Sequence, residues 1–186
     1  MVRLGLASNQ NLPDRVYDAI AKDIDPLVRM QLAENLKTPK MVLERLVRDS
    51  VQSVVITTLQ HRNLPGVWLE QMSSDPSSVI RMAVCQNINT SIIVLERLSS
   101  DSDPSVREAV AMHSAVGGAI LDDLATDSDS TVLMAVVQHP QANRDLLLRF
   151  SQFDENLAVR QVARERLIPL LKGEIREDVL ERWEAQ

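Results

Sequence analysis

The amino-acid sequence predicts an all-α fold built from about six two-helix repeats of 26 residues that stack in a row. An aspartate recurs at this interval, with one inserted residue before its last member: Asp23, Asp49, Asp75, Asp101, Asp127 and Asp154. Five residues after each aspartate stands an aliphatic residue: Val28, Val54, Ile80, Val106, Val132 and Val159. Because both columns keep one period along 186 residues, they indicate a repeat architecture rather than a chance spacing.

Each repeat contains two short apolar stripes with helical spacing. In the first complete repeat, Val16, Tyr17 and Ile20 fall on one helical face, and the same columns recur in the next repeat. A second stripe follows, with Val28 and Leu32 on one face. Each repeat is therefore expected to form a helix and a shorter helix. Since one such pair cannot bury its own apolar face, neighbouring repeats are expected to cover it.

Capping residues mark where the helices begin. Good N-cap residues share one column just before the second helix: Asp25, Ser77, Asp103, Asp129 and Asn156. Pro26 and Pro104 follow directly, at the helical position where a missing N–H costs nothing. Val51 breaks this column, so the second helix of that repeat is expected to have a weaker cap. Ahead of the first helices, Thr38 and Thr90 are expected to serve as caps.

The whole chain, 1–186, is expected to be a single repeat domain. Its parts are a partial repeat over 1–10, the repeats over 11–166 and a C-terminal capping helix over 167–186. The tail is mostly charged but has one apolar side, as a terminal cap requires, formed by Ile175, Val179, Leu180 and Trp183. The partial first repeat leaves Leu4 and Leu6 poorly covered, so a homo-oligomer or a partner is expected at this N-terminal edge.

Composition limits the classes of function. The chain has 26 Asp+Glu against 20 Lys+Arg, a formal net charge of −6, which disfavours nonspecific nucleic-acid binding. Basic residues cluster near the C-terminal end of the chain, but glutamates lie among them and offset their charge. These basic residues are Arg160, Arg164, Arg166 and Lys172. The single cysteine, Cys85, excludes an intrachain disulfide, an all-cysteine zinc site and a self-contained iron–sulfur site. No membrane-spanning apolar run and no secretory signal core are present, so a cytoplasmic protein is expected.

The histidines look at first like a metal-binding set. However, His61, His113 and His139 occupy a turn column that holds asparagine in other repeats. Equivalent residues of stacked helices lie roughly 10 Å apart, whereas metal ligands converge within about 2 Å of one ion. We therefore expect turn-capping roles and no metal site. Cys85 lies in an apolar column and is expected to be a buried, inert thiol.

The second helix also carries a candidate partner-binding surface. One of its columns reads Met30, Ile56, Met82, Glu108 and Met134. Four residues on, a second column starts at Glu34 and continues with Gln60, Gln86, Met112 and Gln138. An exposed surface of methionine and glutamine would be adaptable and suited to a partner helix or peptide. The alternative, which the sequence leaves open, is that the methionine column packs between repeats as ordinary core.

Two segments show the repeat unit in its clearest form. The first is Val-Arg-Met-Gln-Leu-Ala-Glu-Asn-Leu-Lys-Thr-Pro over 28–39, followed by Leu43-Glu44-Arg45-Leu46, and the second is 101–107 with Val110-Ala111. Both resemble the unit of the leucine-rich repeat variant family, and the resemblance covers nearly the whole chain before the C-terminal helix. It implies a right-handed α-solenoid related to HEAT and armadillo repeats. The family's founding type carries a cysteine-ligated iron–sulfur cluster, whose cysteines this chain lacks, so no cofactor is expected.

The Asp-x4-Val-Arg spacing is also similar to HEAT repeats, in which the second helix lines the concave side. There the aspartate and arginine columns form a hydrogen-bond ladder between repeats. In this chain the resemblance assigns the ladder to the aspartate column, with Arg29, Arg81, Arg107 and Arg160. Val55 and Leu133 replace the arginine in two repeats, so the ladder is expected to be interrupted there. Because the columns recur in every unit, they favour a structural role over a catalytic one.

We expect a noncatalytic protein–protein interaction scaffold that presents an extended surface to a protein partner. No Gly-rich phosphate loop, His-Glu-x-x-His helix or Gly-x-Ser-x-Gly elbow is present, so no catalytic, cofactor-binding or metal-binding residues are assigned. The alternative is an accessory or chaperone-like factor for cofactor or metalloprotein assembly, by analogy with both repeat families. A nucleic-acid-binding HEAT-like protein is a third hypothesis, which the acidic charge disfavours.

Overall fold

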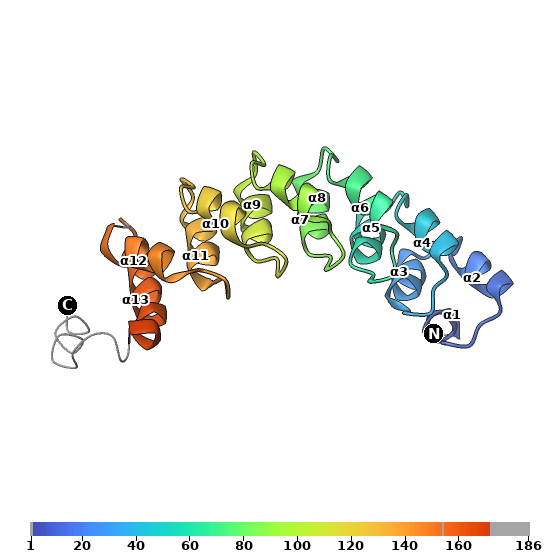
Figure 1. Cartoon of the computed structure of the whole chain (residues 1–186). Helices are drawn as coiled ribbons and strands as arrows, with labels where there is room; N and C mark the ends of the chain where they lie inside the picture. Colours follow the sequence, from blue (N-terminus) through green and yellow to red (C-terminus); the bar gives the residue numbers. More distant parts are fainter. Residues whose placement is uncertain (1, 154, 172–186) are drawn as a thin grey trace. The chain divides into compact units, whose positions relative to one another are not determined.

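A computed structural model describes residues 2–153 and 155–171 of the chain (Figure 1). These residues form helices and no strands, which confirms the predicted all-α repeat solenoid class. The helices are α1 (Val2–Ala7), α2 (Asp14–Ile20), α3 (Pro26–Glu34), α4 (Lys40–Leu46), α5 (Gln52–Leu59), α6 (Gly66–Met72), α7 (Ser78–Cys85), α8 (Ile92–Leu98), α9 (Pro104–Ala111), α10 (Gly118–Leu124), α11 (Ser130–Gln138), α12 (Arg144–Phe153) and α13 (Leu157–Leu171). They belong to two compact units, residues 1–98 and 99–186.

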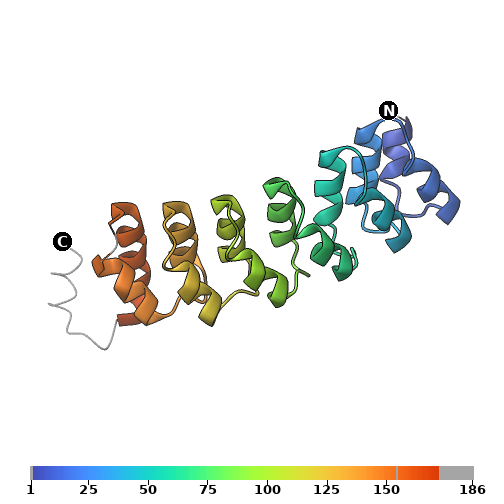
Figure 2. The same ribbon diagram turned by 90° about the horizontal axis from the view of Figure 1, so that it is seen from above.

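In the first unit, the second helices of the repeats form the stacking row. Helix α3 packs against α1 and α5, and α5 packs against α7 (Figure 2). The first helices α2, α4 and α6 pack onto α3, α5 and α7. Val28, Val54 and Ile80 lie inside this row, with exposed fractions of 1%, 0% and 4%. The predicted mutual burial of apolar faces is confirmed here, because each second helix is covered by its neighbours.

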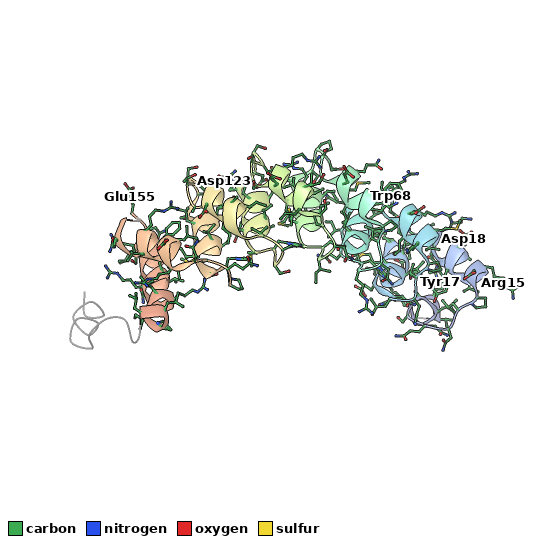
Figure 3. The ribbon with its side chains drawn as sticks, viewed as in Figure 1. Arg15, Tyr17, Asp18, Trp68, Asp123 and Glu155 are labelled. Atoms are coloured by element: carbon green, nitrogen blue, oxygen red, sulfur yellow. The ribbon has the colours of Figure 1, made fainter. Side chains whose placement is uncertain are left out.

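Surface contacts join neighbouring first helices of this unit. Asp18 of α2 forms ion pairs with Lys22 and with Arg45 of α4. Arg48, which follows α4, lies over the ring of Trp68 on α6, 4.3 Å from its centroid. Figure 3 labels Asp18 and Trp68 on their helices. Exposed ion pairs of this kind contribute little free energy, so the buried row of second helices supplies most of the cohesion.

The second unit repeats the arrangement. Helix α9 packs against α11, and α11 packs against α13, while α10 lies on α9 and α11 and α12 lies on α13. The core column continues with Val106, Val132 and Val159, each 0% exposed. At about 1.5–3 kcal/mol for each fully buried aliphatic side chain, this column is a main source of stability in the unit.

Helix α13 spans the expected boundary between the repeats and the capping helix. The repeats were expected to end at residue 166 and a capping helix to begin at 167, but α13 runs unbroken from Leu157 to Leu171. The physical reason is a continuous apolar stripe at a spacing of four residues: Val159, Ala163, Leu167 and Leu171 are all buried. Pro169 lies inside this helix. The amphipathic tail predicted over 174–186 lies outside the described residues.

Several second helices begin at the expected caps. The side chains of Asp25 and Asp103 accept hydrogen bonds from the N–H groups of Leu27 and Ser105, and a proline follows each cap. Val51 provides no side-chain cap, as expected. Ser77 was expected to cap α7 and does not. Its hydroxyl oxygen instead accepts a hydrogen bond from Gln52 at 2.8 Å.

The caps predicted for two first helices were wrong. Thr38 Oγ1 donates to the carbonyl oxygen of Leu32 at 2.6 Å, and Thr90 Oγ1 donates to that of Val84 at 2.6 Å. The N-cap position of α4 belongs to Pro39, with no side-chain hydrogen bond. Both threonines are buried, and carbonyls at the end of the preceding helix lack helical donors. Their hydroxyls therefore bind the C-terminal end of the helix before the turn and do not cap the N-terminal end of the helix after it.

Candidate functional site

The candidate partner-binding residues of the first unit lie at the border between core and solvent. Met30, Ile56 and Met82, on α3, α5 and α7, are half-buried, and Met30 packs against the core cluster. One turn further along each helix, the side chains of Glu34, Gln60 and Gln86 are exposed. Together these six residues are called the methionine–glutamine face. Its apolar column is neither fully core nor fully exposed, because each side chain packs on one side and presents the other.

Glutamine side chains connect neighbouring repeats across this face. Gln60 Nε2 donates a hydrogen bond to Gln86 Oε1 at 3.0 Å, and both residues are exposed. Each amide keeps further donor or acceptor capacity. The face therefore offers half-buried sulfur and methyl groups beside polar groups that can bond a partner backbone.

The corresponding residues of the second unit have a different character. Glu108 and Met134 are half-buried on α9 and α11, while Gln138 is exposed. Met112, directly after α9, is 67% exposed. A carboxylate here takes the place that an apolar side chain holds in the first unit, and a methionine, Met112, takes the place of an exposed polar side chain.

The histidines occupy buried turns and serve as backbone acceptors and donors. Nδ1 of His61 accepts the N–H of Asn63 at 3.0 Å, and Nε2 lies 3.2 Å from the carbonyl oxygen of Asn35. This pattern requires a neutral ring with its proton on Nε2. Burial lowers the pKa of His61 despite the Asn35 carbonyl, which would raise it. Within the second unit, Nδ1 of His139 likewise accepts the N–H of Gln141 at 3.1 Å.

Asparagine performs the same task in other repeats. Asn35 Nδ2 donates to the carbonyls of Ala7 and Asn9, while its Oδ1 accepts the N–H of Lys37. These bonds tie each turn to the preceding one. The shared pattern explains why asparagine and histidine interchange in this column.

Arg166 was missed as a member of this turn column. Its Nη1 donates to the carbonyls of Val137 and His139 at 2.6 and 2.7 Å. In the sequence it follows His139 by 27 residues, since one residue is inserted in this last repeat. Applying that shift to the turn column would have found it. Arg166 is thus engaged inside the fold and does not stand in a free basic cluster.

Cys85 at the end of α7 is 1% exposed. Within 2–153 and 155–171, no group of three or more histidine, cysteine, aspartate or glutamate residues is placed to hold a metal ion. The same ranges contain no helix of the length and apolarity needed to cross a membrane.

The arginine and aspartate columns bind adjacent repeats together. Arg29 donates through Nε and Nη2 to the two carboxylate oxygens of Asp49 at 2.6 and 2.8 Å, and through Nη1 to the Asp23 carbonyl. Arg107 binds Asp127 with the same two distances. Such bidentate pairs are the strong form of a charge-assisted hydrogen bond. The hydrogen bond from Arg107 holds the pKa of Asp127 below its ordinary value, although burial opposes it.

Other members of these columns make similar contacts. Arg3 forms an ion pair with Asp23 at 2.8 Å, and Arg81 Nη1 donates to the carbonyl of Asp75 at 2.8 Å. Arg160 lies half-buried on α13. The last aspartate of the column, Asp154, lies outside the described residues.

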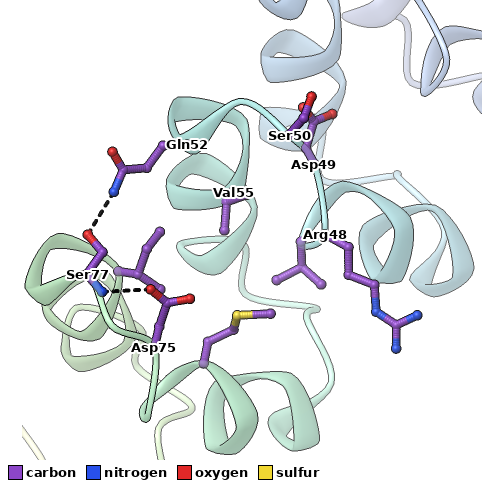
Figure 4. Close-up of a pocket in the computed structure, with 10 residues that line it drawn as sticks. Arg48, Asp49, Ser50, Gln52, Val55, Asp75 and Ser77 are labelled. Carbon is purple, nitrogen blue, oxygen red and sulfur yellow. Dashed lines mark hydrogen bonds between the residues drawn. The ribbon is translucent and has the colours of Figure 1, made fainter.

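A cavity of about 360 Å³ lies in the first unit where Val55 replaces the column arginine (Figure 4). Val55 of α5 and the carboxylate of Asp75 are both in its lining. The Asp75 Oδ1 atom accepts the N–H of Ser77 at 2.9 Å. No lysine, arginine or histidine among the described residues forms an ion pair with Asp75.

Sequence reasoning also missed an apolar column on the first helices. Met41 on α4, Val67 on α6 and Ile93 on α8 are 82%, 64% and 72% exposed. They share one 26-residue column, one position ahead of buried residues such as Val42 and Trp68. The period alone was enough to align them. Their exposure depended on how deeply each first helix is buried.

The stacked helix pairs and their repeated columns define an all-α repeat protein. The chain is similar to a solved structure described as a leucine-rich repeat variant with a novel repetitive protein structural motif. The two are 26% identical, the match covers 84% of this chain and 72% of that chain, and the TM-score is 0.42. The repeat units of this sequence resemble the same family. No family model matches the sequence, and no curated protein matches it.

Proposed function

We propose that the protein is a noncatalytic scaffold that binds a protein partner through the methionine–glutamine face of α3, α5 and α7. The observation that carries this proposal is the in-register row of half-buried Met30, Ile56 and Met82 beside exposed amides joined by the Gln60–Gln86 hydrogen bond. Methionine adapts to irregular partner surfaces. A partner helix would lay its apolar stripe along such a row.

The setting that we propose for this interaction is the cytoplasm. A reducing compartment suits a chain that has one cysteine, Cys85, which is buried and can form no intrachain disulfide.

The experiment compares partner capture by two matched double variants. The first, Met82→Lys with Gln86→Lys, places two positive charges on the proposed face of α7. The second, Val67→Lys with Ile93→Lys, places the same charge on exposed positions of α6 and α8. We expect the first pair to reduce recovery of the wild-type partner about tenfold or more, as loss of a central contact does. The second pair should leave recovery unchanged.

Both double variants must melt within a few degrees of the wild-type protein for the comparison to count. If the α6 and α8 variant loses the partner while the α7 variant keeps it, binding belongs to the exposed column Met41, Val67 and Ile93. That outcome contradicts the proposal.

We also propose self-association at the N-terminal edge, which the sequence led us to expect. Leu4 of α1 packs against the core cluster, but Val2 and Leu6 are 86% and 40% exposed. Two copies could shield these side chains from water. Sedimentation equilibrium should show concentration-dependent association, weakened by the pair Val2→Glu and Leu6→Glu. A wild-type protein that stays monomeric at every concentration would refute self-association.

A further inference from the structure

We infer that the cavity beside Val55 is a binding site for a guanidinium group supplied from outside the chain. None of the six residues of the methionine–glutamine face lines it, and the site is independent of the proposed function. The site follows from comparing this repeat with those that keep the column arginine.

The other repeats show what surrounds a guanidinium at this place. Arg29 points its Nη1 at the Asp23 carbonyl and its Nε and Nη2 at the Asp49 carboxylate. Arg107 does the same between the Asp101 carbonyl and the carboxylate of Asp127. A carbonyl on one side and a carboxylate on the other thus fit the planar donor fork of a guanidinium.

In the repeat with Val55, both acceptors remain and the donor is absent. The Asp49 carbonyl is the equivalent of the Asp23 carbonyl, and no side chain among the described residues donates to it. The Asp75 carboxylate is the equivalent of the Asp49 carboxylate, and its one hydrogen bond comes from the Ser77 N–H. Asp49 Oδ1 accepts both the Val51 N–H and Arg29 Nη2, so Asp75 Oδ1 can likewise accept a second hydrogen bond while Oδ2 accepts the other arm of a bidentate donor.

The cavity has the shape and lining that an arginine side chain needs. Its volume is about 360 Å³. Its apolar wall can cover a methylene chain and is formed by Val55, Met72 and Ile80. Gln52 donates to the hydroxyl of Ser77 at 2.8 Å at the polar rim (Figure 4).

Neighbouring charges permit a cation at this place. Arg29 already neutralises Asp49. Arg48 also lines the cavity, but its guanidinium lies over Trp68 and points away from Asp75 (Figure 4). Arg81 donates to the Asp75 carbonyl, as Arg29 does to the Asp23 carbonyl. Since Asp23 accommodates Arg3 on its carboxylate at the same time, two guanidinium groups can share one such aspartate.

The test is a titration followed by backbone amide chemical shifts. We expect ethylguanidinium to shift the amides around Asp75 and Ser77 saturably, and to bind at least tenfold tighter than ethylammonium, which lacks the planar fork. The same titration with Val55→Arg should show at least a tenfold weaker response, because the variant supplies its own guanidinium. Asp75→Asn, which keeps the shape and removes the charge, should weaken binding similarly.

A second readout does not depend on the added ligand. Val55→Arg should raise the melting temperature by completing the column, whereas Val55→Lys should raise it less. A melting temperature lowered by Val55→Arg would overturn the inference, as would equal binding of ethylammonium or an undiminished response in both Asp75→Asn and Val55→Arg.

A binding comparison with a peptide distinguishes two possible sources of the guanidinium group. A blocked tripeptide with a central arginine is compared with ethylguanidinium. Tenfold tighter binding of the peptide supports an arginine presented by a partner chain, while equal binding supports a small free guanidinium compound. Because the titration uses the purified chain alone, its failure would leave partner binding at the methionine–glutamine face unaffected.

Discussion

Within the turn column, histidine and asparagine perform the same two tasks with different atoms. Nδ1 of His61 and Oδ1 of Asn87 each accept a backbone N–H from two residues later. Both side chains also reach back to carbonyls of the preceding repeat. Histidine does this only while neutral, because protonation turns Nδ1 from an acceptor into a donor. His61 and His139 therefore couple folding to pH, and asparagine does not.

We predict that stability falls as the pH drops from 7.5 to 5.5. Burial lowers the folded-state pKa of His61 and of His139 below the ordinary value of 6.5. The unfolded chain then binds more protons than the folded one, so the free energy of unfolding decreases once the pH falls through about 6.5 toward the folded pKa. The slope is at most about 1.4 kcal/mol per pH unit for each histidine. Urea unfolding at several pH values measures it.

The double variant His61→Asn with His139→Asn provides the control. Asparagine keeps the turn hydrogen bonds seen at Asn35 and removes the titrating ring. Its unfolding free energy should change much less over the same pH range. Identical slopes for the variant and the wild-type protein would show that these two rings are not the source of the dependence.

At the scale of the element, the two helices of a repeat have different tasks. The second helices stack on one another, as α3, α5 and α7 do, whereas the first helices rest on them. Some second helices also begin at side-chain caps, as at Asp25 and Asp103. The first helices begin at Pro13, Pro39 and Pro65 without side-chain caps. Side-chain caps therefore stabilise α3 and α9 of the core row, whereas α5 and α7 of the same row begin without them.

We predict different effects from removing two side chains of one column. Asp25→Ala should destabilise the first unit by about 1 kcal/mol, because the Leu27 N–H loses its capping acceptor. Ser77→Ala should cost less than half as much, since Ser77 provides no cap to α7. Chemical unfolding followed by circular dichroism compares them. Equal losses from the two substitutions would contradict this assignment of the caps.

At the scale of the whole molecule, the described chain consists of two compact units, each with its own buried column. Val54 belongs to the first unit and Val106 to the second, and both are 0% exposed. In a repeat protein, stability is close to a sum of contributions from each repeat and its nearest neighbours. Damage to one column should therefore be felt mainly in its own unit.

We predict that Val106→Asp unfolds the second unit and spares the first. A buried charge without a partner costs more than about 4 kcal/mol. Hydrogen exchange should show lost protection over residues 99–171 and retained protection over the helices of 1–98. Val54→Asp, the matched control, should give the reverse pattern. Uniform loss in both units after either substitution would show that the chain unfolds as a single cooperative body.

The sequence by itself determined the helical class, the repeat period and the residues that form the buried column. These features follow from local rules, because helical geometry brings residues three and four apart onto one face and a fixed period aligns equivalent faces. It also located the missing arginine at Val55. Local rules did not determine the burial of the column Met30, Ile56 and Met82. The sequence was compatible with a core position and with a surface position for this column.

Only the tertiary structure decided how deeply each aligned column lies and which groups meet across repeats. Thr38 donates to the preceding helix, Arg166 enters the turn column, and Met41 stands exposed. The cavity beside Asp75 likewise exists because of where the α5 and α7 repeats come to rest. Depth and cross-repeat contacts depend on the packing of neighbouring elements. Helical spacing within one element carries no information about that packing.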